Sequence, residues 1–108
     1  RTMAGAKFHH FGVPTTQQAG KEEYLEGAKV YITNADEHPF HIEFLRFDKD
    51  SPMHPDVQNT PHAAFMVDNL DEAIQGRTVI VEPFDANPSL RVAFIKDGDA
   101  VLELMEAR

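Results

Sequence analysis

The chain has 108 residues, 42% of them hydrophobic and 26% charged, which is ordinary for a globular protein and enough for one domain with a modest core. Its formal net charge of -8 counts against nucleic acid and anionic membrane surfaces as partners. The lack of cysteine excludes disulfides, thiolate metal ligands and thiol nucleophiles, and it fits the reducing cytoplasm in which we expect the protein.

Strand patterns dominate the first half of the chain. We expect residues 1–6 to be a flexible leader outside the domain, which would occupy residues 7–108. The polar stretch 15–27 has few apolar anchors and predicts at most a short helix. Two strands flanking the polar loop ADEHP should form a β-hairpin. The expected strands are KFHHFGV (7–13, ended by Pro14), AKVYITN (28–34) and FHIEFLRF (40–47).

Residues 48–60 contain prolines and show no periodicity, which predicts a loop or linker between two halves, about 7–47 and 61–106. The second half opens with a strand in PHAAFMV (61–67). A helix should follow over residues 68–76, with Asp68 or Asn69 as the N-cap and Gly76 as the stop. Three strands complete the chain: TVIVEPF (78–84), LRVAFIK (90–96) and AVLELME (100–106), the last two joined by the turn DGD.

The loop DANPS (85–89) is expected to be an ordinary hairpin connection, with a cover over a cleft as the alternative. The second half therefore runs strand, helix, strand, strand, strand, and the first half repeats that order with its helix reduced.

Four polar residues within these strands form a repeated pattern, in which a histidine in one strand is followed by a glutamate in a later strand. The pairs are His10 with Glu43, and His62 with Glu103. Two imidazoles and two carboxylates suit a divalent ion such as Zn, Ni, Mn or Fe. Each residue alone would more readily be read as a core histidine or a solvated glutamate. Their repetition favours a metal site.

Strand alternation predicts which side chains share a face. Glu43 should share one with His41 and Leu45, which makes His41 a candidate for a pocket beside the metal. The opposite faces are strongly apolar and should pack against helices or neighbouring structure. His9 should point away from His10, and Arg91 could meet an anionic substrate, although a surface ion pair is the simpler expectation.

At these residues the chain resembles the vicinal oxygen chelate superfamily, which includes glyoxalase I, extradiol dioxygenases and bleomycin resistance proteins. HHFGV resembles the family's opening strand, HAAFMVDNLDEAI its second-module opening, and RVAFIKDGDAVLELME its closing hairpin. The resemblance implies an α+β fold of two βαβββ modules, whose mixed sheet curls around a metal cleft, here with the first-module helix shortened. It also implies the ligand set His10, Glu43, His62 and Glu103.

This ligand set is most similar to that of glyoxalase I. The resemblance implies an isomerase, epimerase or lyase that acts on a small vicinal-oxygen substrate through a metal-stabilised enediolate, with Glu103 as the first choice for the general base and Glu43 as the second. It also implies a homodimer, and it leaves open whether one chain supplies all four ligands. Two alternatives are a non-catalytic small-molecule or antibiotic-binding protein of the bleomycin resistance type, and a module that keeps the ligands without turnover.

Overall fold

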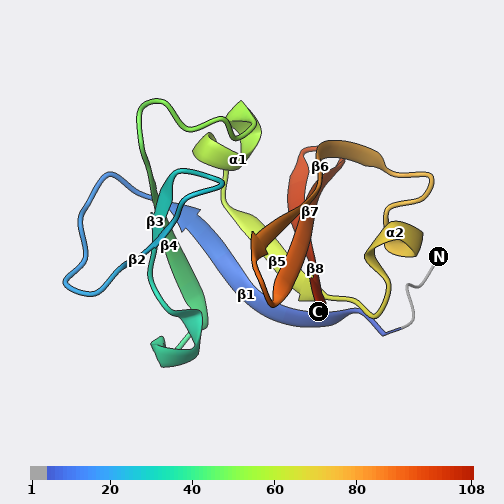
Figure 1. The fold of residues 1–108 in the computed structure, drawn as a ribbon, viewed down its shortest axis with the longest axis horizontal. Coiled ribbons are helices and arrows are strands. Elements are labelled where there is room, and N and C mark those ends of the chain that lie inside the picture. Colours follow the sequence, from blue (N-terminus) through green and yellow to red (C-terminus); the bar gives the residue numbers. More distant parts are fainter. Residues whose placement is uncertain (1–4) are drawn as a thin grey trace.

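The computed structural model describes residues 5–108. The described residues form an α+β fold, in which eight strands make one curled, mixed sheet and the helices are short (Figure 1). The strands are β1 (Lys7–Pro14), β2 (Glu23–Leu25), β3 (Val30–Ile32), β4 (Ile42–Phe47), β5 (His62–Met66), β6 (Thr78–Asn87), β7 (Leu90–Asp97) and β8 (Ala100–Ala107). The helices are η1 (Ala35–Glu37, a 3-10 turn), α1 (Pro55–Asn59) and α2 (Leu70–Ala73).

The strand order across the sheet is β2-β3-β4-β1-β5-β8-β7-β6. Strand β1 is parallel to β4, β5 is parallel to β8, and β1 and β5 join the two halves in an antiparallel pair. Read outward from this junction, both halves place their first strand next to their last one. The curl sets β2–β4 on one side of β1 and β5 and sets β6–β8 on the other (Figure 1).

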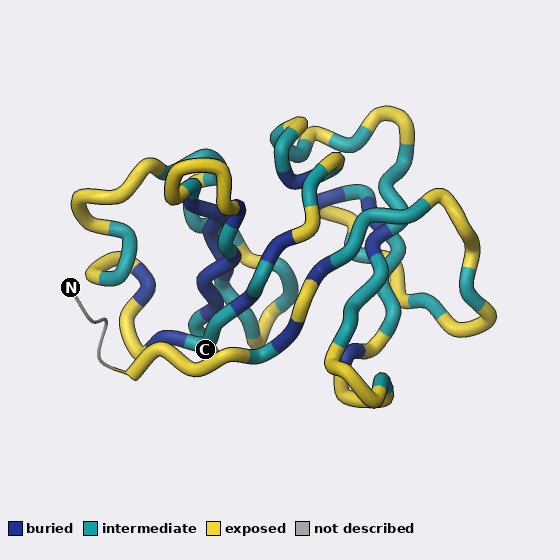
Figure 2. The backbone as a smooth tube through the Cα atoms, turned by 180° about the vertical axis from the view of Figure 1, so that it is seen from behind, coloured by how far each residue is buried: buried dark blue, intermediate teal, exposed yellow. Residues whose placement is uncertain are grey.

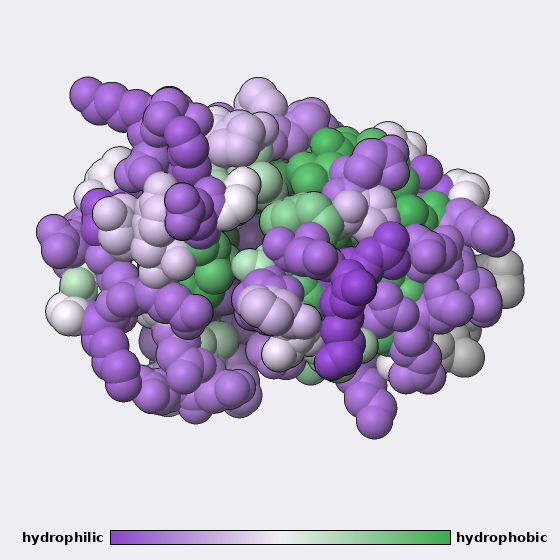
Figure 3. All heavy atoms as spheres, in the orientation of Figure 1, coloured by the Kyte–Doolittle hydropathy of each residue, from purple (hydrophilic) through white to green (hydrophobic). Residues whose placement is uncertain are grey.

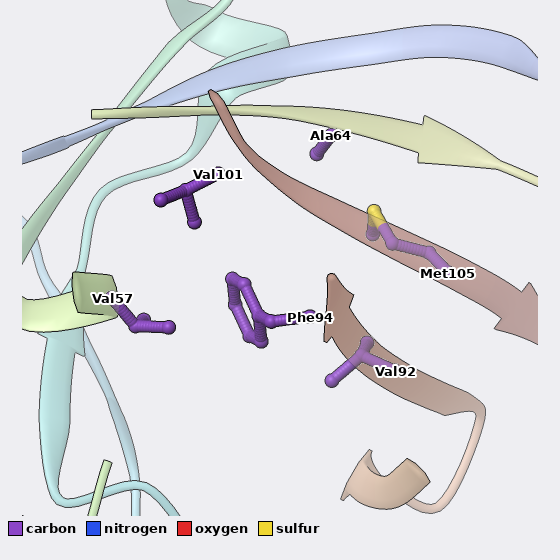
Figure 4. Close-up of a cluster of buried hydrophobic side chains, with 6 residues drawn as sticks. All are labelled: Val57, Ala64, Val92, Phe94, Val101 and Met105. Carbon is purple, nitrogen blue, oxygen red and sulfur yellow. The ribbon is translucent and has the colours of Figure 1, made fainter. Parts of the chain in front are cut away.

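The buried apolar side chains are concentrated in the second half of the sheet, as the dark segments of Figure 2 show. One cluster lies on the inner face, where side chains of α1, β5, β7 and β8 converge around Phe94 (Figure 4). A second cluster lies on the outer face, where α2 inserts the fully buried Leu70. The first half has only a small cluster of Ala28, Val30 and Leu45. The front face of the molecule is mostly hydrophilic (Figure 3).

The first half departs from the sequence-based expectation in its polar segment. Residues 15–22 form no helix, and Glu23–Leu25 form the edge strand β2, which pairs with β3. The segment has too few apolar residues to bury a helical face, so pairing with an existing strand is its more favourable conformation. With no helix over this half, Phe8, Phe11 and Phe40 remain 48%, 49% and 73% exposed. No helix therefore covers the apolar outer face of this half among the described residues.

The proposed linker is also more ordered than predicted, because it contains α1. The His54 side chain caps this helix by accepting from the Asp56 N–H at 3.0 Å, and Pro55 occupies the first turn, where its missing N–H costs nothing. Val57 is fully buried in the inner cluster, and Lys96 on β7 holds Asp56 at 2.9 Å. The segment therefore packs against the sheet instead of spanning freely between two halves.

The second half confirms the predicted order of strand, helix and three strands. The helix is shorter than the predicted range 68–76, with Asn69 as its N-cap and Gly76 in a left-handed conformation at φ 74°. Strand β6 runs on to Asn87, so the predicted loop 85–89 is mostly strand, and only its last two residues form the turn. Most of the predicted leader, residues 1–4, lies outside the described residues. Within residues 5–108, no helix is both long and apolar enough to cross a membrane.

Candidate metal centre

The four predicted ligands lie on the four central strands of the sheet and come together within one chain. His10 is on β1, Glu43 on β4, His62 on β5 and Glu103 on β8. The pairing of β1 with β4 has the same register, relative to these residues, as the pairing of β5 with β8. Glu43 stands opposite Gly12, two residues after His10, and Glu103 stands opposite Ala64, two residues after His62. The same offset in both halves brings each glutamate next to its histidine.

His10 lies between two carboxylates. Its Nε2 is 3.5 Å from Glu43 Oε1 and 3.5 Å from Glu103 Oε1, and its side chain is only 2% exposed. His62 Nε2 lies 3.0 Å from the same oxygen of Glu103, and the two imidazole centroids are 5.9 Å apart. His10, His62 and Glu103 offer ligand atoms within 4.8 Å of one another, and Glu43 adjoins this group through His10.

The spacings between these atoms would suit ligands around one metal ion. Two ligand atoms at about 2.1 Å from an ion are about 3.4 Å apart at a tetrahedral angle and about 3.0 Å apart at a right angle. The observed contacts of 3.5, 3.5 and 3.0 Å match these edges. His10 Nε2 and His62 Nδ1 are also buried and have no hydrogen-bond partner among the described residues. A buried nitrogen without a partner, facing two carboxylates, fits a divalent cation.

Gly12 makes room for His62. A Cβ added to Gly12 would lie 2.1 Å from His62 Cε1 and 2.3 Å from Nε2, inside the van der Waals radii of both atoms. The two residues are paired across β1 and β5, so the imidazole lies directly over the glycine. Only a residue without a side chain lets His62 stand beside His10.

His9 contacts His10 instead of pointing away from it, because β1 is irregular between Phe8 and His10. The two Nδ1 atoms are 2.8 Å apart, so one ring donates its N–H and the other accepts. When His10 is the donor, its Nδ1 carries a proton and its Nε2 can present a lone pair toward the carboxylates. Phe8, which stands at this irregularity, is half exposed.

The pKa values of the centre reflect this crowding of opposite charges. Burial alone would lower the pKa of His10, but the neighbouring carboxylates of Glu103 and Glu43 outweigh it and raise the pKa to about 9. Burial would raise the pKa of Glu103, but His10 and His62 bring it well below the ordinary value. In the metal-free protein at neutral pH, His10 is therefore a cation between two carboxylates, which is the charge arrangement that a metal ion would replace.

A cavity of about 100 Å³ lies against the centre, between the two halves of the sheet, and we call it the central cavity. His10, Glu43 and Glu103 form its polar wall. Most of the remaining wall is apolar, and both halves contribute to it through Leu25, Val30, Ile32, Phe47, Phe84, Leu90, Val92 and Phe94. A ligand in this space would touch both the carboxylates and a hydrocarbon surface.

The two further residues suggested for the pocket lie elsewhere. His41 precedes β4, is exposed and has a φ of 55°, so it does not continue the face of Glu43 and does not line the central cavity. Arg91 pairs with Asp71 at 3.0 Å and Glu106 at 3.6 Å, which is the surface ion pair that the sequence suggested as the simpler expectation. Sequence reasoning missed Gly12 and the wall residues of β2. The glycine two positions after His10 was the available signal.

Comparison with known proteins finds a similar fold but identifies no activity. No protein-family model matches the chain, and no curated protein matches it. Among solved structures, the chain is similar to a hypothetical protein, BH1468 from Bacillus halodurans C-125, with a TM-score of 0.72 and 21% sequence identity. The match covers 95% of both chains. This likeness extends over nearly the whole fold and assigns neither chain a function.

Proposed function

We propose that this protein is a metal-dependent enzyme of the vicinal oxygen chelate type, acting as an isomerase, epimerase or lyase on a small substrate with two adjacent oxygens. The observation that carries the proposal is His10 Nε2, buried without a hydrogen-bond partner among the described residues and 3.5 Å from each of two carboxylate oxygens. The equal strand order and equal His-to-Glu register of the two halves support paired βαβββ modules, the first without its helix.

His10, His62 and Glu103 would hold the ion, and Glu43 would complete the set. A bound divalent ion would supply a Lewis acid that stabilises negative charge developing on the substrate oxygens. The apolar wall of the central cavity would exclude water from the substrate, and His9 would keep the His10 ring in one orientation.

The contacts favour Glu43 over Glu103 as the general base, which reverses the ranking that the family resemblance suggested. Glu103 is fixed by two histidines, and its lowered pKa makes its carboxylate a poor proton acceptor. Glu43 contacts one histidine and has the more exposed side chain, 17% against 11%. It also lines the central cavity, so its carboxylate can reach a substrate carbon by rotating away from His10.

The test compares two isosteric variants loaded with Zn or Ni. Glu103→Gln should lose most of its metal, whereas Glu43→Gln should keep metal and lose at least a hundredfold in kcat. The readout is exchange of the α-hydrogen of a neutral α-hydroxyketone in D₂O, followed by NMR. Metal-independent exchange in the wild type would contradict the proposal.

A non-catalytic binding protein is the second candidate, because the central cavity is mostly apolar. Such a protein would bind its ligand equally well after treatment with EDTA, which separates the two functions in a single titration.

We further propose a cytoplasmic homodimer. Phe8 and Phe11 are about half exposed with ring centroids 4.8 Å apart, and Phe65 packs 5.9 Å from Phe8, which gives the outer face of the sheet an aromatic patch that a second copy would bury. Sedimentation at micromolar concentration should give the mass of two chains, and a single monomeric species would contradict the dimer.

A further inference from the structure

The wall of the central cavity offers an anion no unpaired cation among the described residues, because its one basic side chain, His10, already lies between two carboxylates. Within the described residues 5–108, no lysine or arginine lines this cavity. Besides the three residues of the metal centre, its polar lining consists of Glu23, which is exposed at the edge strand, and Asn87. One of these adds negative charge, and the other is neutral.

Three cations on the strands around the cavity, Arg46, Arg91 and Lys96, are held by other partners. Arg46 on β4 donates to Glu22 at 2.7 and 3.1 Å and lies over the Tyr31 ring. On β7, Arg91 pairs with Asp71 and Lys96 pairs with Asp56. Bringing one of these side chains into the cavity would break its existing ion pair.

A bound metal would not supply the missing positive charge. The carboxylates of Glu43 and Glu103 together neutralise a divalent ion, and Glu23 leaves the neighbourhood negative. A carboxylate or phosphate on the ligand would therefore lose its hydration against an apolar wall without gaining a counter-ion, which is strongly unfavourable.

We infer that the central cavity takes an uncharged ligand with a small apolar body, which presents two adjacent oxygens to the metal centre. The class excludes glutathione conjugates, coenzyme A thioesters and phosphorylated sugars whose anionic groups enter the cavity. The volume of about 100 Å³ is below the roughly 150 Å³ cavity that binds benzene, so the enclosed part of the body is a short aliphatic chain or part of a ring. This inference rests on the proposed metal site.

The test uses two hydroxamic acids that differ only at the end of the chain. Butanehydroxamic acid ends in a methyl group, and the monohydroxamic acid of succinic acid carries a carboxylate at the same position. Both present two adjacent oxygens. Calorimetric titration of the Zn-loaded protein should give a dissociation constant at least tenfold weaker for the carboxylate compound. Protein stripped with EDTA should bind neither compound measurably.

A variant that adds a cation to the cavity wall should reduce this preference by tightening binding of the carboxylate compound. Leu25→Lys places an ammonium on the edge strand β2, facing the cavity, and should tighten binding of the carboxylate compound at least fivefold. The control Tyr24→Lys adds the same charge at the neighbouring residue, which does not line the cavity, and should leave binding unchanged.

Three outcomes would overturn the inference. Metal-loaded protein that binds both compounds equally, or binds neither, would contradict the ligand class alone. Protein that takes up no metal would overturn the proposed function, and the inference with it.

Discussion

At the scale of single residues, the proposed metal centre depends on a glycine as much as on its proposed ligands. Gly12 faces both Glu43 and His62 across the two neighbouring strands. Because the His62 ring occupies the space where a Cβ would stand, any side chain at this position must displace a ligand. The identity of residue 12 therefore decides whether the two histidines can share one ion.

Gly12→Ala tests this dependence. The added methyl group should destabilise the protein by roughly 1–3 kcal/mol, as overpacking of a core usually does, and should weaken metal binding by displacing His62. Gly27→Ala is the matched control, because nothing lies within 4 Å of a Cβ at that position. Urea denaturation of both variants gives the measurement, and equal stability of the two would contradict the steric role of Gly12.

The raised pKa of His10 predicts how the stability of the metal-free protein depends on pH. Because the pKa is about 9 in the fold and 6.5 in the unfolded chain, the protonated form stabilises the fold. This contribution, roughly 3 kcal/mol, is complete below pH 6.5, falls between pH 6.5 and 9, and is lost above pH 9.

Denaturation of EDTA-treated protein at several pH values checks this prediction. Stability should fall with rising pH across that window in the wild type, and this fall should be absent in His10→Gln. Metal binding should show the opposite trend, because a histidine ligand must lose its proton. A wild-type profile that is flat from pH 6.5 to 9 would show that the two carboxylates do not hold His10 as a cation.

At the scale of elements, the short helix α1 packs between the two halves of the sheet. Its Val57 is fully buried against Phe94 and Val101 (Figure 4). Its Asp56 pairs with Lys96 on β7. Since Val57 also lines the central cavity, the helix closes part of that space. The prolines of this segment led to the prediction of a loop. Pro55 and Asp56, which follow the N-cap His54, are nevertheless typical of a helix N-terminus.

Val57→Ala should enlarge the cavity and cost roughly 1–3 kcal/mol of stability, because the buried methyl groups leave space that the sheet cannot refill. Val79→Ala, the same change at a half-buried residue of the outer cluster, should cost less. Thermal denaturation of both variants would reveal the difference. A Val57→Ala variant as stable as the wild type would mean that α1 does not hold the halves together.

At the scale of the whole molecule, periodicity predicted most strands because each one alternates or buries a continuous apolar run. The repeat of His and Glu predicted which four polar side chains come together, since equal registers in both halves bring them to one place. The edge strand β2, the contact of His9 with His10 and the walls of the cavity could not be predicted. The contact of His9 with His10 depends on an irregularity within β1, the edge strand β2 depends on pairing with β3, and the cavity walls depend on segments far apart in the chain.

The central claim is that His10, Glu43, His62 and Glu103 hold one divalent ion. Metal analysis of protein purified without added metal, and again after dialysis against Zn and Ni, tests it most directly. The wild type and the control His41→Ala/Glu82→Gln, whose exposed residues lie outside the centre, should each carry about one ion per chain. The variant His62→Ala/Glu103→Gln should carry almost none. Near-zero metal in all three proteins, or equal metal in all three, would contradict the account.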